Sequence, residues 1–149
     1  MTQEKKIAVG ADHAGYELKE KIKDILNTLG YQVVDFGTNS SDSVDYPLIA
    51  KVLAKSVASK EPPKGILICG TGIGMSIAAN KIKGIIAAHC TDIETAKLAR
   101  QHNNSNILTI GGRTTNPELA KEIVKVWLET EFEGGRHQRR VQEIRDLER

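Results

Sequence analysis

Short apolar runs alternate with longer amphipathic segments along almost the whole chain. Five runs, at residues 7–10, 33–36, 65–69, 85–88 and 107–110, are too short for helices and mostly lack polar alternation. Such runs are typical of strands that are buried on both faces of a parallel sheet. The alternation therefore predicts parallel strands that are joined by helical crossovers.

The segments between these runs carry helix signals at their ends. A capping residue or an early proline marks the start of a helix, and a glycine marks a stop. Gly30 ends a helix with apolar positions at 18–29, and Asp45-Tyr46-Pro47 and Asn116-Pro117-Glu118 each begin a helix. Two more helices are predicted, one at 95–101 and a last one after a hinge at 131–135.

The resulting order is βαβαβαβαβα followed by one more helix. It predicts an α/β fold, a doubly wound, Rossmann-like domain with three αβα layers around a five-stranded parallel sheet. With 149 residues, the chain is expected to be a single domain, residues 1–149, with an extra C-terminal helical tail at 136–149.

Composition argues against several classes of function. Charged residues make up 27% of the chain and the net charge is only +2, so neither a disordered chain nor a nucleic-acid-binding protein is expected. Two cysteines are too few for a disulfide framework, and no apolar stretch is long enough for a signal peptide or a membrane span. We therefore expect a cytoplasmic protein with reduced thiols and no membrane partner.

In a doubly wound sheet, ligands bind beyond the carboxyl ends of the strands. The third predicted strand ends at Cys69, and the glycine-rich segment after it can direct backbone N–H groups toward an anion. This segment lacks the last glycine of the dinucleotide motif G-x-G-x-x-G and the Gly-Lys pair of a P-loop. It could also be only a tight turn. Its residues are Gly70, Thr71, Gly72, Ile73 and Gly74.

Two interpretations of Cys69 are open. Neighbouring amides and a helix N-terminus would favour its thiolate form, which could act as a base or a nucleophile. Alternatively, Cys69 is a small buried hydrophobic residue, which is the commoner fate of a free cysteine. Cys90 has no glycine cradle beside it, and we assign it to packing.

Further candidate residues lie at both edges of the predicted sheet. Asp12 and His13 follow the first strand at the same edge as Cys69, although an aspartate near a helix start is often only a cap. His102 and Asn103 follow a helix and precede the fifth strand, which places them at the opposite edge. His102 is either a solvated histidine at a helix end or part of a second subunit's site.

Three arginines are candidate phosphate ligands. Arg136 and Arg140 are one helical turn apart on one face, and Arg113 follows the fifth strand. The alternative is a solvated basic helix face, which most charge runs are.

Together these motifs resemble the ribose-5-phosphate isomerase B family, which also includes hexose-phosphate isomerases, over essentially the whole chain. The resemblance is carried by several motifs in the same order. They are Gly10-Ala11-Asp12-His13-Ala14-Gly15, Asp45-Tyr46-Pro47, Ile68-Cys69-Gly70-Thr71-Gly72-Ile73-Gly74, Ala78-Ala79-Asn80-Lys81, Arg100-Gln101-His102-Asn103 and Glu133-Gly134-Gly135-Arg136-His137.

The resemblance implies an aldose–ketose isomerase of the pentose phosphate pathway that interconverts ribose 5-phosphate and ribulose 5-phosphate without a metal or other cofactor. It also implies a homodimer, or a dimer of dimers, with active sites between subunits. Cys69 would move a proton between sugar carbons, and His102 of the neighbouring subunit would help to open the furanose ring.

The remaining roles are also implied by the resemblance. Gly70 to Gly74 would stabilise the enediolate with the help of Thr71, and Asp12 would bind sugar hydroxyls and take part in ring opening. Some relatives use a glutamate farther along the loop as the base, but no acid stands near Met75-Ser76 here. Arg139 has no assigned role. Substrate or phosphate binding would fall to His13, Asn103, Arg113, Arg136, His137 and Arg140.

Three alternative functions stay open. An allose- or galactose-6-phosphate isomerase is the nearest, although galactose-6-phosphate isomerases of this family have two unlike subunits, which favours the pentose enzyme for a chain holding every matched residue. A non-catalytic sugar-phosphate sensor would keep the glycine segment and the arginines without turnover. A nucleotide-binding module is the third.

Overall fold

The computed structural model describes residues 5–148, so residues 1–4 and 149 of the predicted domain lie outside the described residues. Within 5–148, one parallel sheet has the strand order β2-β1-β3-β5-β4. Its strands are β1 (Lys6–Ala11), β2 (Gln32–Asp35), β3 (Gly65–Cys69), β4 (Ala87–His89) and β5 (Ile107–Gly111). The helices are α1 (Tyr16–Thr28), α2 (Tyr46–Ala58), α3 (Ile73–Ala79), α4 (Ile93–Gln101), α5 (Pro117–Glu129) and α6 (Arg136–Arg145).

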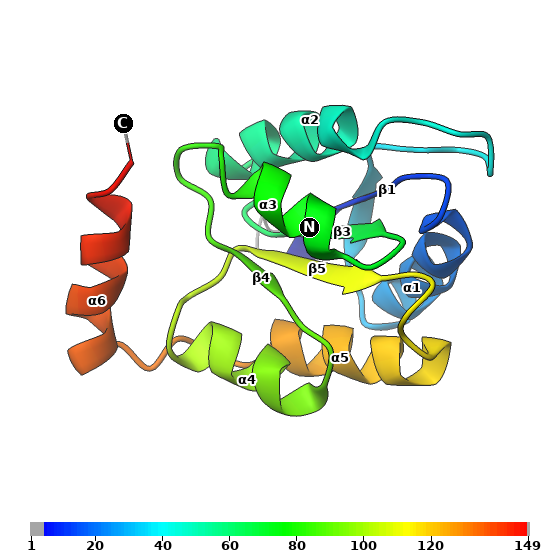
Figure 1. Cartoon of the computed structure of the whole chain (residues 1–149). Helices are drawn as coiled ribbons and strands as arrows, with labels where there is room; N and C mark the ends of the chain where they lie inside the picture. The colour runs from blue at the N-terminus through cyan, green and yellow to red at the C-terminus, as the bar shows by residue number, and fades with distance from the viewer. Residues whose placement is uncertain (1–4, 149) are drawn as a thin grey trace.

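Helices cover both faces of the sheet, as Figure 1 shows. Helices α2 and α3 pack on one face around Leu53 and Met75. Helices α1, α4 and α5 pack on the other face, where Ile22 and Trp127 lie in a larger apolar core. The predicted α/β class, the order of elements and the parallel sheet are confirmed. No helix within 5–148 is long and apolar enough to cross a membrane.

The fourth strand differs from its prediction. It begins at Ala87 instead of Ile85 because the side chain of Asn106 takes the place of strand pairing just before it. The Oδ1 atom of Asn106 accepts a hydrogen bond from the Ile86 N–H at 2.9 Å, and its Nδ2 donates to the carbonyl of Gly84 at 2.9 Å. The strand also ends one residue later than predicted, because His89 still pairs with Thr109 of β5.

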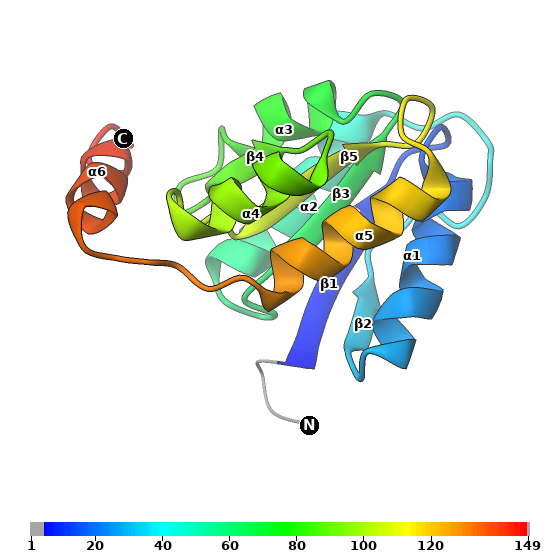
Figure 2. The ribbon, with the colours of Figure 1, turned by 90° about the horizontal axis from the view of Figure 1, so that it is seen from below.

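Helix α6 stands apart from the three layers. Figures 1 and 2 show it at the end of an extended linker, on the side opposite to the tips of the strand arrows. The linker is tied back to α4 where the Glu133 N–H donates to the carbonyl of Gln101 at 3.1 Å. The predicted terminal helix is therefore present, and it belongs to the amino edge of the sheet.

A buried arginine holds this amino edge together. Arg100, near the end of α4, donates from Nε to the carbonyl of Thr130 at 3.2 Å and from Nη1 to the carbonyl of Ser105 at 2.6 Å. Its guanidinium carbon lies 5.9 Å from the centroid of the Trp127 ring, and the Nε1–H of Trp127 donates to Oγ of Ser105 at 2.8 Å. One cation thus connects α4, α5 and the start of the linker.

The Trp127–Ser105 hydrogen bond gives a direct test of this packing. Ser105→Ala leaves the buried indole N–H without its acceptor, and such a loss costs about 1–3 kcal/mol. Urea unfolding followed by the fluorescence of Trp127, the single tryptophan, measures the change. Thr91→Ala, on an exposed residue, is the control and should change the free energy of unfolding by less than about 0.5 kcal/mol. Equal stability of the two variants would contradict a structural role for this bond.

Candidate active site

Three neighbouring strands bring their carboxyl ends together at one edge. Strand β3 lies between β1 and β5, with Ile68 paired to Ala11 and Cys69 paired to Gly111. The chain continues this pairing beyond the strands, because the Asp12 N–H donates to the Ile68 carbonyl at 3.1 Å and the Arg113 N–H donates to the Gly70 carbonyl at 3.0 Å. The structure therefore groups Asp12, Cys69 and Arg113 as the sequence predicts.

Cys69 is buried, with 5% of its surface exposed, and its sulfur faces the glycine segment. The Gly72 N–H donates a hydrogen bond to Sγ at 3.2 Å. Next to it, Oγ1 of Thr71 accepts from the Ile73 N–H at 3.2 Å, and α3 begins there with N–H groups that have no intrahelical acceptors. This geometry can stabilise negative charge on the sulfur and on an oxygen nearby.

Two of the three glycines in the segment, Gly72 and Gly74, are packed so closely that a larger residue would not fit. Gly72 has φ +82°, and a Cβ there would lie 2.7 Å from Nδ1 of His89. A Cβ on Gly74 would lie 2.5 Å from the ring of Tyr46. Tyr46 and His89 therefore border the segment, although neither has a predicted role. Tyr46 belongs to a predicted helix start and to one motif of the family resemblance, and His89 follows the fourth predicted strand.

Asp12 and His13 are each held by a backbone N–H group. Oδ1 of Asp12, which is 6% exposed, accepts from the Gly15 N–H at 3.0 Å, so the aspartate does cap the turn before α1. Nδ1 of His13 accepts from the Val44 N–H at 3.2 Å. The Arg113 side chain lies close to the glycine segment. Its Nη1 is 3.7 Å from the point where a Cβ on Gly70 would lie.

The other predicted residues lie at the amino edge. His102 follows α4, and its ring stacks on that of His137 with 4.2 Å between centroids. Oε1 of Glu133 lies 4.0 Å from Nε2 of His102 and 3.6 Å from Nε2 of His137. Loss of solvent around the ring, with the nearby His102 and Arg136, lowers the pKa of His137, whereas Glu133 acts to raise it.

These three side chains are the one group of histidine, cysteine, aspartate and glutamate residues within 5–148 that is close enough to share a metal ion. Their ligand atoms lie within 4.8 Å of one another. A shared interaction with the Glu133 carboxylate equally accounts for the closeness of the two histidines. No role is predicted for Glu133 from the sequence, because only the fold brings its carboxylate beside His102 and His137.

The arginines of α6 are exposed on the same side of the molecule. Arg136 and Arg140 are one turn apart on the helix. Nε of Arg139 lies 3.9 Å from Oε1 of Glu143. Asn103 is also exposed. The predicted site residues thus form two groups at opposite ends of β3, which spans roughly 13 Å. One chain does not bring the two groups together.

Cys90 has surroundings unlike those of Cys69. It is 1% exposed within the larger core, and burial raises the pKa of its thiol to about 11. These surroundings fit the packing role assigned from the sequence.

Comparison with known proteins agrees with this arrangement over nearly the whole chain. A model of the family described as ribose/galactose isomerase matches residues 7–144. Ribose-5-phosphate isomerase B of Escherichia coli (strain K12) is 51% identical over 144 residues, which cover 97% of each chain.

Solved structures show the same fold. Ribose-5-phosphate isomerase B of Clostridium thermocellum superimposes with a TM-score of 0.94 at 51% identity, over 95% of this chain and 96% of the other. The enzyme of Mycoplasma genitalium, solved with bound ribulose-5-phosphate, gives a TM-score of 0.92 at 43% identity, over 95% of both chains. Similarity of this extent defines the class of protein as a sugar-phosphate isomerase with an α/β fold. The chain belongs to the ribose/galactose isomerase family.

Proposed function

We propose that the protein interconverts ribose 5-phosphate and ribulose 5-phosphate, with Cys69 as the base. The observation that carries this proposal is the contact between Cys69 Sγ and the Gly72 N–H at the carboxyl edge of the sheet. The Gly72 N–H would still donate to the sulfur after the thiol has lost its proton, and a thiolate can take a proton from carbon. The relative from Mycoplasma genitalium, with ribulose-5-phosphate bound, supports a pentose phosphate as the ligand.

The reaction then proceeds through an enediolate. The Cys69 thiolate takes the proton from C2 of the open-chain aldose, and the electron pair of that bond forms the C1=C2 double bond while O1 becomes negatively charged. N–H groups of residues 70–74, with Thr71, stabilise this charge. A proton passes from O2 to O1, and Cys69 returns its proton to C1. The carbonyl group is then at C2, and the thiolate is regenerated.

The two separate groups of site residues support a site that two subunits share. Asp12, His13 and Arg113 would come from the chain that supplies Cys69. The amino edge of the second copy would supply the remaining groups. His102 of that copy would help to open the furanose ring, and its arginines would hold the phosphate. These residues are His102, Asn103, Arg136, His137 and Arg140.

An exposed apolar surface on α2 and α3 fits the interface of such a homodimer. Leu48 and Val52 lie one turn apart on α2 and are 64% and 56% exposed, and Ile73 and Ile77 on α3 are 53% and 59% exposed. The two helices pack against each other on one face of the sheet. A second copy docked here would reach the glycine segment, because Ile73 is part of both.

Two other functions need separate tests. A hexose 6-phosphate isomerase would use the same residues with a deeper pocket, and the description of the matching family includes galactose. A sugar-phosphate sensor would bind ribose 5-phosphate at saturating concentration without producing ribulose 5-phosphate.

The assignment of Cys69 as the base predicts a large loss of turnover when its thiol is removed. Cys69→Ala should lower kcat about 100- to 10,000-fold, which is the range that a positioned general base contributes. Cys90→Ala is the matched control, and it should retain turnover because that thiol is buried in the core. The assay follows ribulose 5-phosphate formation in the presence of a chelator, which should not slow the wild-type enzyme.

The same assay separates the alternatives. Higher kcat/KM for allose or galactose 6-phosphate would identify a hexose enzyme, and binding without turnover would identify a sensor. Full activity of Cys69→Ala would contradict the assignment of the base.

The shared site predicts recovery of activity in mixtures. Inactive Cys69→Ala and His102→Ala chains should form hybrid dimers in which one of the two sites has both wild-type residues. At equal concentrations and free exchange, half of the dimers are hybrids, so activity should return to about one quarter of the wild-type value. Subunit exchange measured by native mass spectrometry without any recovery would show that each site is built from one chain.

The phosphate-binding role of α6 predicts a difference between substrates. Arg140→Ala should lower kcat/KM for ribose 5-phosphate about 100-fold, through lost affinity and lost orientation, and change the slow reaction of free ribose much less. Arg139→Ala is the control on the same helix, since Arg139 has no role in the proposal. Equal losses for phosphorylated and free sugar would exclude Arg140 as a phosphate ligand.

A further inference from the structure

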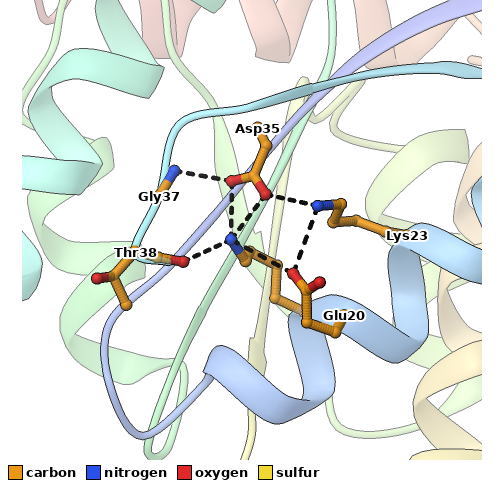
Figure 3. Close-up of polar contacts among 6 residues, drawn as sticks. Glu20, Lys23, Asp35, Gly37 and Thr38 are labelled. Atoms are coloured by element: carbon orange, nitrogen blue, oxygen red, sulfur yellow. Dashed lines mark hydrogen bonds and ion pairs between the residues drawn. The ribbon is translucent and has the colours of Figure 1, made fainter. Parts of the chain in front are cut away.

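An ion pair between α1 and the end of β2 has no part in the reaction as proposed. Lys19, in the first turn of α1, is 0% exposed, which is rare for a lysine. Its Nζ donates to both carboxylate oxygens of Asp35 at 2.8 Å and to the carbonyl of Thr38 at 2.6 Å (Figure 3). These three bonds use all the donors of an ammonium group.

The charge of Asp35 is secured by the same contacts. Burial acts to raise the pKa of this carboxyl group, but hydrogen bonds from Lys19 and Lys23 outweigh it and lower the pKa. The carboxylate also accepts from the Gly37 N–H at 2.8 Å. The Asp35 carboxylate therefore stays ionised at neutral pH, and its contacts fix the chain where it leaves β2.

This point is joined directly to the active-site edge. The Thr38 N–H donates to the carbonyl of Ala11 at 2.6 Å, and the Ala11 N–H donates to the carbonyl of Gly37 at 2.7 Å. Ala11 immediately precedes Asp12. Lys19 thus connects α1, the end of β2 and the end of β1 in one place.

The segment that begins here contacts His13 at its other end. Residues 37–44, which we name the β2–α2 loop, run from the Lys19 contact to Val44, whose N–H donates to Nδ1 of His13. Because a backbone N–H can only donate, Nδ1 accepts, and the ring proton of neutral His13 is on Nε2. The loop therefore fixes both the direction of this ring and the nitrogen that can donate to a ligand.

We propose that Lys19 is a positioning residue that sets the β2–α2 loop and, through Val44, the orientation and tautomer of His13; the proposal rests on the proposed isomerase function. A buried ion pair seldom adds net stability, since packed apolar side chains of similar volume often replace it without loss. An apolar side chain cannot, however, aim a donor at the Thr38 carbonyl. The need for a directed contact explains a charge at this position.

The test removes both charges together. In Lys19→Met/Asp35→Leu, no buried charge is left unpaired, because Lys23 is partly exposed and keeps its ion pair with Glu20 at 3.4 Å. The thermal midpoint should therefore stay close to that of the wild type. The kcat/KM for ribose 5-phosphate should nevertheless fall by about 10- to 100-fold, because a misplacement of about 1 Å costs that much. Lys23→Met is the matched control: it removes a 2.8 Å ion pair to the same carboxylate without touching Thr38, and it should change kcat/KM by less than about twofold.

Two readouts separate positioning from a purely structural role. Adding His13→Ala should lower kcat/KM less in the double variant than in the wild type, because Lys19 acts through His13. The ¹⁵N chemical shifts of His13 should report the Nε2–H tautomer in the wild type and a mixture of tautomers in the double variant.

Wild-type kcat/KM in the double variant, or fully additive losses with His13→Ala, would overturn the inference. A proton on Nδ1 of His13 in the wild-type protein would also overturn it, even if the variants fail to fold. Absence of any turnover by the wild type would overturn the proposed function alone, and the tautomer measurement would then decide about Lys19.

Discussion

The parallel pairing of β1, β3 and β5 determines where chemistry can occur in this protein. The three strands run side by side in one direction. Residues that follow a strand therefore lie at one edge of the sheet, and residues that follow a crossover helix lie at the other. Cys69 and Asp12 reach the first edge in this way, and His102 reaches the second. The distribution of candidate residues is therefore a consequence of topology before any side chain is considered.

Each edge is organised by one buried cation that binds backbone carbonyls. Lys19 contacts the Thr38 carbonyl at the carboxyl edge, and Arg100 contacts the carbonyls of Thr130 and Ser105 at the amino edge. Each cation lies in a helix and binds carbonyls of residues outside the helices and strands, where the chain leaves regular structure. The planar guanidinium can reach carbonyls in two directions at once, whereas the compact ammonium collects three acceptors around a single point.

Much of this arrangement could be predicted from local sequence patterns. The apolar runs and helix signals indicated the fold, and the residues after each strand indicated Cys69 and its glycine segment. Contacts between distant segments could not be predicted in this way. Lys19 has the pattern of an ordinary charged residue in an amphipathic helix, and its burial depends on Asp35, sixteen residues later. The contact of Glu133 with two histidines likewise exists only because the linker returns to α4.

The position of α6, far from its own Cys69, has a consequence for the evolution of such a chain. In the proposed dimer, each site draws one half from each copy. After gene duplication, one copy could lose its sulfur while the other lost its basic helix, and the mixed pair would still contain one intact centre. Because each chain contributes to two different sites with its two ends, duplicated copies of such a chain can specialise into two unlike subunits.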